Sequence, residues 1–192
     1  MRSFEKNLEN LQTDYLDLYL IHMPYGDYHG SWRAMEELYR AGKVRAVGVC
    51  NFLPDRLVDL ILSHEVVPAV NQIELHPFCQ QRKLRRVMEQ YHICPMAWAP
   101  FAEGQDGIFQ HPVLAKIGAQ YGKTPAQVIL RWMRQSNIIT IPKSVHAERI
   151  RQNFDVDDFV LSAKDMEQVG KLDRGHSLIL GVPNLDEVYR VH

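Results

Sequence analysis

Residues 16–24 have the sequence LDLYLIHMP, and this short stretch decides the fold. Its apolar part has the length of one strand, and near-continuous apolar character suits a strand buried on both faces of a parallel sheet. His22 follows that strand directly. A polar side chain at the C-terminal end of a parallel strand stands where β/α enzymes keep their chemistry. The stretch therefore predicts a buried parallel strand with a functional group at its end.

The same pattern of strand, polar end and helix recurs along the chain. Further strands are predicted at residues 44–49, 69–74, 94–99 and 138–141. Apolar residues at helical spacing fill the gaps, and Ser31 and Ser162 are the predicted N-caps of two of these helices. Two helices in succession precede the last strand. We expect helices at residues 4–11, 31–41, 82–91, 112–121, 125–135 and 163–171, one starting at Pro54, and a short one after Ser144.

Strands that alternate with helices predict an α/β fold, either a doubly wound sheet or a barrel. No GxGxxG follows the first strand, which counts against a doubly wound dinucleotide-binding fold. Polar residues at the strand ends favour a parallel β/α barrel of the TIM type. A complete barrel of eight units needs about 250 residues, whereas this chain has 192. We expect an incomplete barrel of about five of the eight units, forming one domain over residues 1–192.

The composition excludes several classes of partner. The net charge is -1, which gives no reason to expect nucleic acid or an anionic membrane as a partner, and the longest apolar runs are strand-sized, far short of the roughly 20 residues that a membrane helix needs. The three cysteines form no CxxC pair, which indicates a reducing, cytoplasmic compartment. The nine histidines lack any metal-ligand spacing, so no metal site is expected. His29 and His64 are predicted at the surface, and Glu36 and Glu37 on the solvated side of a helix.

Four motifs closely resemble signatures of the aldo-keto reductase family, in order and spacing. They are LDLYLIHMP at 16–24, GVCNF at 48–52, VNQIE at 70–74 and IPKS at 141–144. The ending 185–192 looks like that of bacterial aldehyde reductases of the 2,5-diketo-gluconate reductase kind. The resemblance implies the C-terminal part of a family barrel, without its first three units. It implies hydride transfer from NADPH to the carbonyl of small aldehydes, ketones or keto-sugars.

His22 is the catalytic candidate. An imidazole at a strand end can hydrogen-bond a carbonyl oxygen and hold it toward its reaction partners. The resemblance implies that His22 orients the substrate carbonyl. From periodicity alone, a core histidine bonded to a backbone group is the commoner interpretation.

Four more strand-end residues are candidates for binding the nicotinamide. An amide side chain offers both a donor and an acceptor to a carboxamide, and the resemblance implies this role for Asn51 and Gln72. Cys50 stands where the family often has serine. Trp98 offers a flat face on which the nicotinamide ring could stack. The alternatives are a turn-forming asparagine, a satisfied barrel glutamine and a core tryptophan.

Residues 141–153, with the sequence IPKSVHAERIRQN, predict an anion site. Lys143 and Ser144 leave the last strand, and Arg149 and Asn153 are four apart on one helix face. A phosphate there would meet a lysine, a hydroxyl, an arginine and backbone N–H groups. The resemblance implies the adenosine 2′-phosphate site of NADPH, with Gln152 and Asn153 near the adenine. A basic solvated helix face is the alternative.

The family's acid is a tyrosine beside a lysine that an aspartate supports, and no matching motif occurs in the sequence. Tyr25 and Tyr28 follow His22 without an evident lysine partner. The first hypothesis is a reductase whose truncated chain is inactive alone, monomeric when intact, with open strand edges that could associate. The second is a non-catalytic remnant that binds NADPH weakly or serves as a partner subunit. The third is another phosphate-binding barrel enzyme, such as an aldolase or isomerase, using Lys143 or Glu74.

Overall fold

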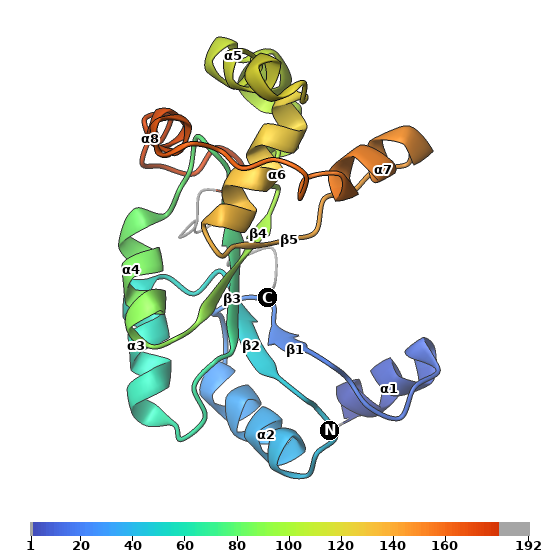
Figure 1. Cartoon of the computed structure of the whole chain (residues 1–192). Helices are drawn as coiled ribbons and strands as arrows, with labels where there is room; N and C mark the ends of the chain where they lie inside the picture. Colours follow the sequence, from blue (N-terminus) through green and yellow to red (C-terminus); the bar gives the residue numbers. More distant parts are fainter. Residues whose placement is uncertain (1, 181–192) are drawn as a thin grey trace. The chain divides into compact units, whose positions relative to one another are not determined.

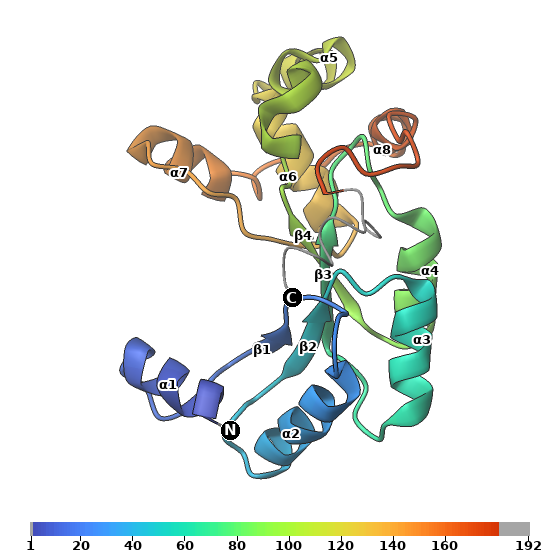
Figure 2. The same cartoon turned by 180° about the vertical axis from the view of Figure 1, so that it is seen from behind.

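The computed structural model describes residues 2–180, and it is an α/β structure (Figures 1 and 2). Its strands pair in parallel, β1 with β2, β2 with β3 and β4 with β5, and parallel strands are what the sequence predicts. The ending 185–192 lies outside the described residues. The elements are α1 (Arg2–Leu11), β1 (Tyr19–Ile21), α2 (Tyr28–Arg40), β2 (Val47–Cys50), α3 (Pro54–Ser63), β3 (Val70–Glu74), α4 (Arg82–Gln90), β4 (Cys94–Trp98), the 3-10 segment η1 (Ala102–Gln110), α5 (Pro112–Tyr121), α6 (Pro125–Gln135), β5 (Ile139–Thr140), α7 (Ala147–Phe154) and α8 (Ala163–Gly170).

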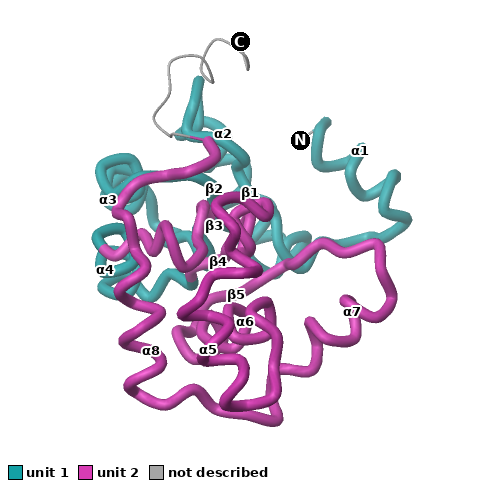
Figure 3. The backbone as a smooth tube through the Cα atoms, turned by 90° about the horizontal axis from the view of Figure 1, so that it is seen from above, with its two compact units in different colours: residues 1–72, 83–94 teal, residues 73–82, 95–192 magenta. Residues whose placement is uncertain are grey.

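The chain forms two compact units, drawn in teal and magenta in Figure 3. The first comprises residues 1–72 and 83–94, and the second comprises residues 73–82 and 95–192. Strand β3 contributes to both units, because the boundary falls between Gln72 and Ile73. The expectation that residues 1–192 are one domain stays a prediction.

In the first unit, β2 pairs with β1 on one side and with β3 on the other. All four residues of β2 are buried, as a strand covered on both faces requires. Helix α2 packs against β1 and β2, and α3 and α4 lie side by side (Figures 1 and 2). The centre of α2 is Trp32, which is 0% exposed and donates its indole N–H to the Val66 carbonyl at 3.2 Å.

Gly48 in the middle of β2 is required by the closeness of its neighbours. A Cβ atom at this position would lie 2.6 Å from the Val70 carbonyl oxygen and 2.8 Å from the Leu20 side chain. Contacts below 3 Å with backbone need the strand itself to move. The glycine therefore lets β2 sit tightly between β1 and β3, and this spacing sets where the ends of the three strands fall.

In the second unit, β4 pairs with β5, with Met96 opposite Ile139 and Ala97 opposite Thr140. The two successive helices before β5 are confirmed as α5 and α6, with the predicted bounds. The buried residues of α6 include Val128, Ile129, Leu130 and Met133. Each of α6 and α8 begins with a reciprocal capping box, which satisfies N–H groups of the first turn. Ser162 is the N-cap of α8, as predicted.

The prediction that Ser31 caps α2 is wrong. The helix begins at Tyr28, and Asp27 is its N-cap, accepting the Gly30 backbone N–H at 2.7 Å. Ser31 lies inside the first turn and donates its hydroxyl to the Asp27 carbonyl at 3.0 Å. Gly30 makes this possible, because a Cβ there would lie 2.1 Å from an Asp27 carboxylate oxygen. Aspartate and serine cap equally well, so residue type alone did not separate the two positions.

No helix in residues 2–180 is both long and apolar enough to cross a membrane.

The capping assignment predicts different costs for two alanine substitutions. Asp27→Ala removes the acceptor of the Gly30 N–H and should lower the free energy of unfolding by about 1 kcal/mol. Ser31→Ala removes an exposed hydroxyl inside the turn and should cost no more than about 0.5 kcal/mol. Urea unfolding of both variants measures the two effects. Equal costs, or a larger cost for Ser31→Ala, would restore the original assignment.

Candidate active site

Four of the predicted site residues meet at the strand ends of the first unit. Cys50 is paired in register with Gln72, and the Cys50 thiol lies 3.6 Å from the Gln72 side-chain oxygen. The backbone N–H of Asn51 donates to the Gln72 carbonyl at 2.9 Å. The Asn51 side-chain amide donates to the carbonyl of His22 at 3.3 Å. These contacts join the ends of β1, β2 and β3 into one polar cluster, which we call the strand-end cluster (His22, Cys50, Asn51 and Gln72).

Asn51 links the other residues of the strand-end cluster, because it hydrogen-bonds both the His22 and the Gln72 carbonyl. Its φ of 61° lies in the left-handed region, which asparagine adopts more readily than most residues. This turn points the side-chain amide back toward β1, where Nδ2 also lies 3.3 Å from the Met23 sulfur. The residue is only 6% exposed. The side-chain amide of Asn51 is therefore held in place by contacts within the fold. It is also the kind of group that can pair with a carboxamide.

Asn71 is a supporting residue that the sequence did not reveal. It is 0% exposed, and its side-chain amide donates to the Phe52 carbonyl at 2.8 Å. This bond fixes the segment between Asn51 and the start of α3. The available signal was a polar residue inside an otherwise apolar strand, one position before Gln72.

Cys50 acts as a neutral hydrogen-bond donor. Burial raises the pKa of its thiol to about 11, so the thiol keeps its proton at neutral pH. A protonated, buried thiol is a poor nucleophile. The thiol proton can be donated to Gln72, and this contact sets which end of the Gln72 amide faces β2.

His22 follows β1 directly and is exposed. Its carbonyl is tied to Asn51, so the backbone at the catalytic candidate is fixed while the ring is accessible. Tyr25, three residues later, has a buried hydroxyl without a hydrogen-bond partner among residues 2–180. No lysine within residues 2–180 bonds this hydroxyl. The role of His22 as the residue that orients a substrate carbonyl stays a prediction.

In the second unit, Trp98 ends β4 and is half-buried, unlike Trp32 and Trp132, which belong to the core. Its carbonyl accepts the Leu75 N–H at 3.4 Å. Because Ala97 lies opposite Thr140, the end of β4 and the chain leaving β5 lie at the same edge. The segment that leaves β5 at that edge carries Lys143 and Ser144.

Helix α7 follows that segment with an open N-terminus. Its N-cap residue, His146, provides no side-chain cap, and the Ser144 hydroxyl accepts the His146 N–H at 3.2 Å. Lys143 and Arg149 are exposed, and neither forms an ion pair with another residue of the described 2–180 range. Unpaired positive charge next to free helix N–H groups is the arrangement that binds phosphate.

The other predicted residues of α7 differ in their engagement. Gln152 donates its side-chain amide to Glu148 at 3.2 Å, and Asn153 is half-buried. Glu148 also faces Arg151 at 3.9 Å, one turn along the helix. Glu148, the acidic residue of α7, therefore pairs with Arg151. Lys143 and Arg149 have no carboxylate partner within residues 2–180. Both predicted cations of the phosphate site remain suited to an anionic ligand.

Glu74 does not qualify as a catalytic base. It is 3% exposed, lies 3.1 Å from His76 Nε2, and accepts the Leu178 N–H at 2.8 Å and the Ser177 hydroxyl. Burial raises the pKa of this carboxyl, but the hydrogen bonds from His76, Ser177 and Leu178 outweigh burial and lower it. A carboxylate whose oxygens are so occupied has a structural role, and this leaves Lys143 as the remaining candidate for the aldolase or isomerase hypothesis.

No group of three or more His, Cys, Asp or Glu side chains within residues 2–180 is placed to hold a metal ion. The strand-end cluster and the α7 segment are the two sets of candidate residues. That both sets serve one ligand stays a prediction.

Comparison with known proteins matches the aldo/keto reductase family model to residues 1–105 and 110–174. The chain is 44% identical to the methylglyoxal reductase DkgA of Yersinia pestis over 180 residues, covering 92% of this chain and 65% of that protein. It is also 44% identical to the glyoxal reductase of Bacillus subtilis over 189 residues, covering 98% of this chain and 67% of that protein. The chain thus spans about two thirds of the length of these relatives.

Solved structures agree with the sequence comparisons. The apo form of Gox0644 is 40% identical with a TM-score of 0.91, and the match covers 95% of this chain and 68% of that one. An aldo-keto reductase of Bombyx mori in complex with NADP is 29% identical with a TM-score of 0.87, covering 97% of this chain and 65% of that one.

The linking role and left-handed backbone of Asn51 predict that two substitutions at this position lower the stability by different amounts. Asn51→Ala loses the hydrogen bond to the His22 carbonyl. Alanine also adopts the left-handed region less readily than asparagine, so this substitution should lower the free energy of unfolding by about 2 kcal/mol. Asn51→Gly loses the same bond but tolerates the backbone, so it should cost about 1 kcal/mol less. Chemical unfolding of the two variants measures this. If alanine is no worse than glycine, the left-handed turn contributes nothing.

Proposed function

The chain belongs to the aldo/keto reductase family, and from this premise we propose that it is the C-terminal part of an NADPH-dependent carbonyl reductase. The observation that carries the proposal is the strand-end cluster, where His22 and three hydrogen-bonding side chains are tied together across three strands. The proposed substrates are small aldehydes, ketones or keto-sugars. Relatives named for reduction of glyoxal and methylglyoxal support that class.

We propose that His22 holds the substrate carbonyl. Its ring is accessible while its backbone is anchored by Asn51, so an imidazole N–H can be presented to a carbonyl oxygen in a fixed direction. A donor aimed at that oxygen stabilises the negative charge that develops there during reduction. The histidine thereby orients the substrate and polarises its carbonyl bond.

The remaining candidates are proposed to hold NADPH, which supplies the hydride when it is bound. Asn51 and Gln72 would bind the carboxamide, Cys50 would keep the Gln72 amide in one orientation, and Trp98 would offer its ring face. The 2′-phosphate would lie on Lys143, Ser144 and Arg149, with Gln152 and Asn153 near the adenine. The uncompensated charge of Lys143 and Arg149 supports the fit. A relative bound to NADP supports the choice of cofactor.

The proton for the alkoxide needs a separate acid. The sequence holds no match to the family's aspartate, tyrosine and lysine motifs, so we infer that these 192 residues do not turn over by themselves. The alternative function is a weak NADPH binder or partner subunit without catalysis. A cytoplasmic setting is proposed from the three free cysteines, and a monomer in the intact fold, with association through strand edges as the alternative.

The first test is turnover. The 192-residue chain should show no measurable NADPH-dependent reduction of methylglyoxal, because it lacks the acid. A chimera that adds the N-terminal third of the Bacillus subtilis glyoxal reductase should reduce it, and His22→Ala in that chimera should lower kcat roughly 100- to 1,000-fold. His92→Asn, at an exposed turn, serves as the control.

Ordinary turnover by the chain alone would refute the inferred inactivity. A folded chimera that binds NADPH without turnover would favour the non-catalytic alternative.

The second test is cofactor selectivity. In the same chimera, Lys143→Ala or Arg149→Ala should each weaken NADPH binding about tenfold, the loss of one charge-assisted contact to phosphate, and should change NADH binding less than about twofold. Fluorescence titration with both cofactors measures the effect. Arg151→Ala is the matched control, because Arg151 lies on the same helix and faces Glu148. Equal losses for NADPH and NADH would refute the phosphate assignment.

A further inference from the structure

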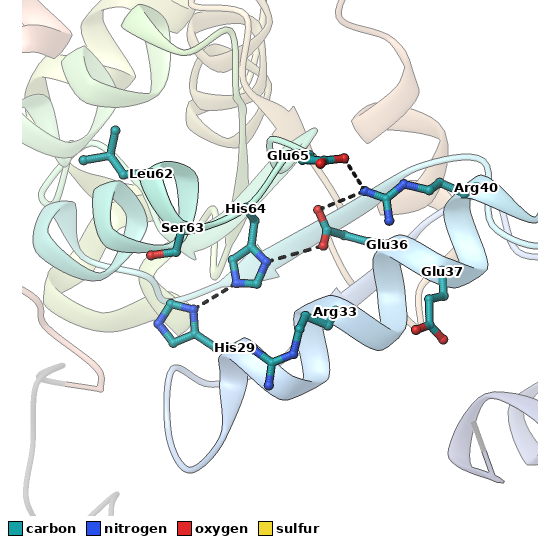
Figure 4. A pocket seen from close by; sticks show the side chains of 9 residues that line it. All are labelled: His29, Arg33, Glu36, Glu37, Arg40, Leu62, Ser63, His64 and Glu65. Atoms are coloured by element: carbon teal, nitrogen blue, oxygen red, sulfur yellow. Dashed lines mark hydrogen bonds and ion pairs between the residues drawn. The ribbon is translucent and has the colours of Figure 1, made fainter.

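Two histidines in the first unit, His29 and His64, meet between α2 and the end of α3, and neither belongs to the strand-end cluster. The predicted exposure of Glu36 and His64 is wrong, because Glu36 is 6% exposed and the His64 side chain is 5% exposed, whereas Glu37 is exposed as predicted. Figure 4 shows His29, His64 and Glu36 in a row along a hollow of about 630 Å³. The predicted solvated face of α2 therefore carries a buried carboxylate that faces a buried imidazole.

A continuous line of hydrogen-bonding atoms runs through this row. Asp59 Oδ2 lies 3.1 Å from His29 Nε2. His29 Nδ1 lies 3.0 Å from His64 Nε2, and His64 Nδ1 lies 3.4 Å from Glu36 Oε2. All four ring nitrogens are used, and a carboxylate stands at each end. We call this row the histidine chain (Asp59, His29, His64 and Glu36).

Both terminal carboxylates are acceptors. Asp59 accepts the Tyr28 hydroxyl at 3.1 Å, and the hydrogen bonds from Tyr28 and then His29 hold its pKa below the usual range. Glu36 Oε1 accepts the Val66 N–H at 2.9 Å and lies 3.8 Å from Arg40. Ionised carboxylates only accept hydrogen bonds, so the outer nitrogen of each imidazole has to carry a proton.

The proton count then decides the state of the inner contact. Three hydrogen bonds need three protons, but two neutral imidazoles carry one each. With both outer nitrogens protonated, His29 Nδ1 and His64 Nε2 would present two lone pairs to each other at 3.0 Å. One added proton satisfies all three bonds. A second would oppose two N–H groups and two positive charges.

We propose that the histidine chain is a binding site for one proton, shared by His29 and His64, that fastens α3 to α2. The two rings meet through their nitrogen atoms (Figure 4), and 3.0 Å is the length of an N–H···N bond. The histidine chain therefore joins α2 and α3 most strongly when its two rings together carry one proton more than they do when both are neutral.

The charged groups around the histidine chain favour a single added charge. From α2 these are Arg33, Glu37 and Arg40, and Arg40 is engaged with Glu65 at 2.8 Å. From α3, Arg56 donates to the Tyr28 hydroxyl at 3.3 Å. Arg40 and Arg56 thus have partners of their own, and Asp59 and Glu36 are the carboxylates in direct contact with the two rings. One carboxylate at each end of the pair stabilises the single positive charge that the two rings share.

The pH dependence has two limbs. An unperturbed histidine gains its proton near pH ~6.5. Above that range the folded chain holds one proton that the unfolded chain lacks, so the stabilisation is lost as pH rises and the proton leaves. In acid the unfolded chain binds two protons and the folded chain one, so the stabilisation is lost as pH falls. The contribution of the pair is therefore greatest at intermediate pH.

A double-mutant cycle tests this on the full 192-residue chain. Urea unfolding of the chain, His29→Asn, His64→Gln and the double variant is followed from about pH 5 to about pH 9, both with and without EDTA. The coupling between the two histidines should peak within this range and fall on both sides, by up to about tenfold in equilibrium constant per pH unit. His92→Asn, at an exposed turn, should show no such peak.

A coupling that is flat or changes in one direction only would overturn the proposal. So would a coupling that EDTA abolishes, because a metal ion would then bridge the rings. A second measurement covers variants that fail to fold: histidine ring 15N shifts of the unaltered chain. One ring of the pair should carry protons on both nitrogens near neutral pH, and two ordinary neutral rings would refute the shared proton.

Discussion

The parallel pairing of β2 with both neighbours is the constraint on which the candidate site depends. Gly48 allows the three strands to close, since any side chain there would strike the Val70 carbonyl. The resulting register sets Cys50 against Gln72 and ties Asn51 to the carbonyl after β1. A slip by one residue would turn every side chain of β2 to the other face and disperse the cluster.

Buried polar side chains join separate segments of this fold, and each does so through different hydrogen bonds. Asn71 holds a turn, Glu74 anchors the segment at Ser177, and Glu36 ends the histidine chain. Such groups are costly without partners, so their bonds fix one arrangement of the segments that they join. Glu74 and Glu36 are both buried carboxylates, yet Glu74 meets a single histidine, whereas Glu36 faces a pair that is short of one proton.

Much of the fold and of the candidate site followed from local pattern. The apolar runs gave all five strands, and proline at the first turn gave the starts of α3, α5 and α6. His22 and Asn51 were predicted as site residues because each stands directly after an apolar strand, and Lys143 because it lies in the segment that leaves the last strand. The prediction that Ser31 is the N-cap was wrong because Asp27, directly before α2, is an equally good capping residue. Periodicity does not choose between two competent caps.

The sequence by itself determined the class of fold, the family and the types of side chain at the strand ends, because strand and helix periods and strand-end residues are local properties. Only the tertiary structure decided which polar groups share a proton or a hydrogen bond. Glu36 and His64 are 28 positions apart, and no pattern within either helix indicates that they touch. Their contact depends on how α2 and α3 pack, and that packing results from burial of the whole unit around Trp32.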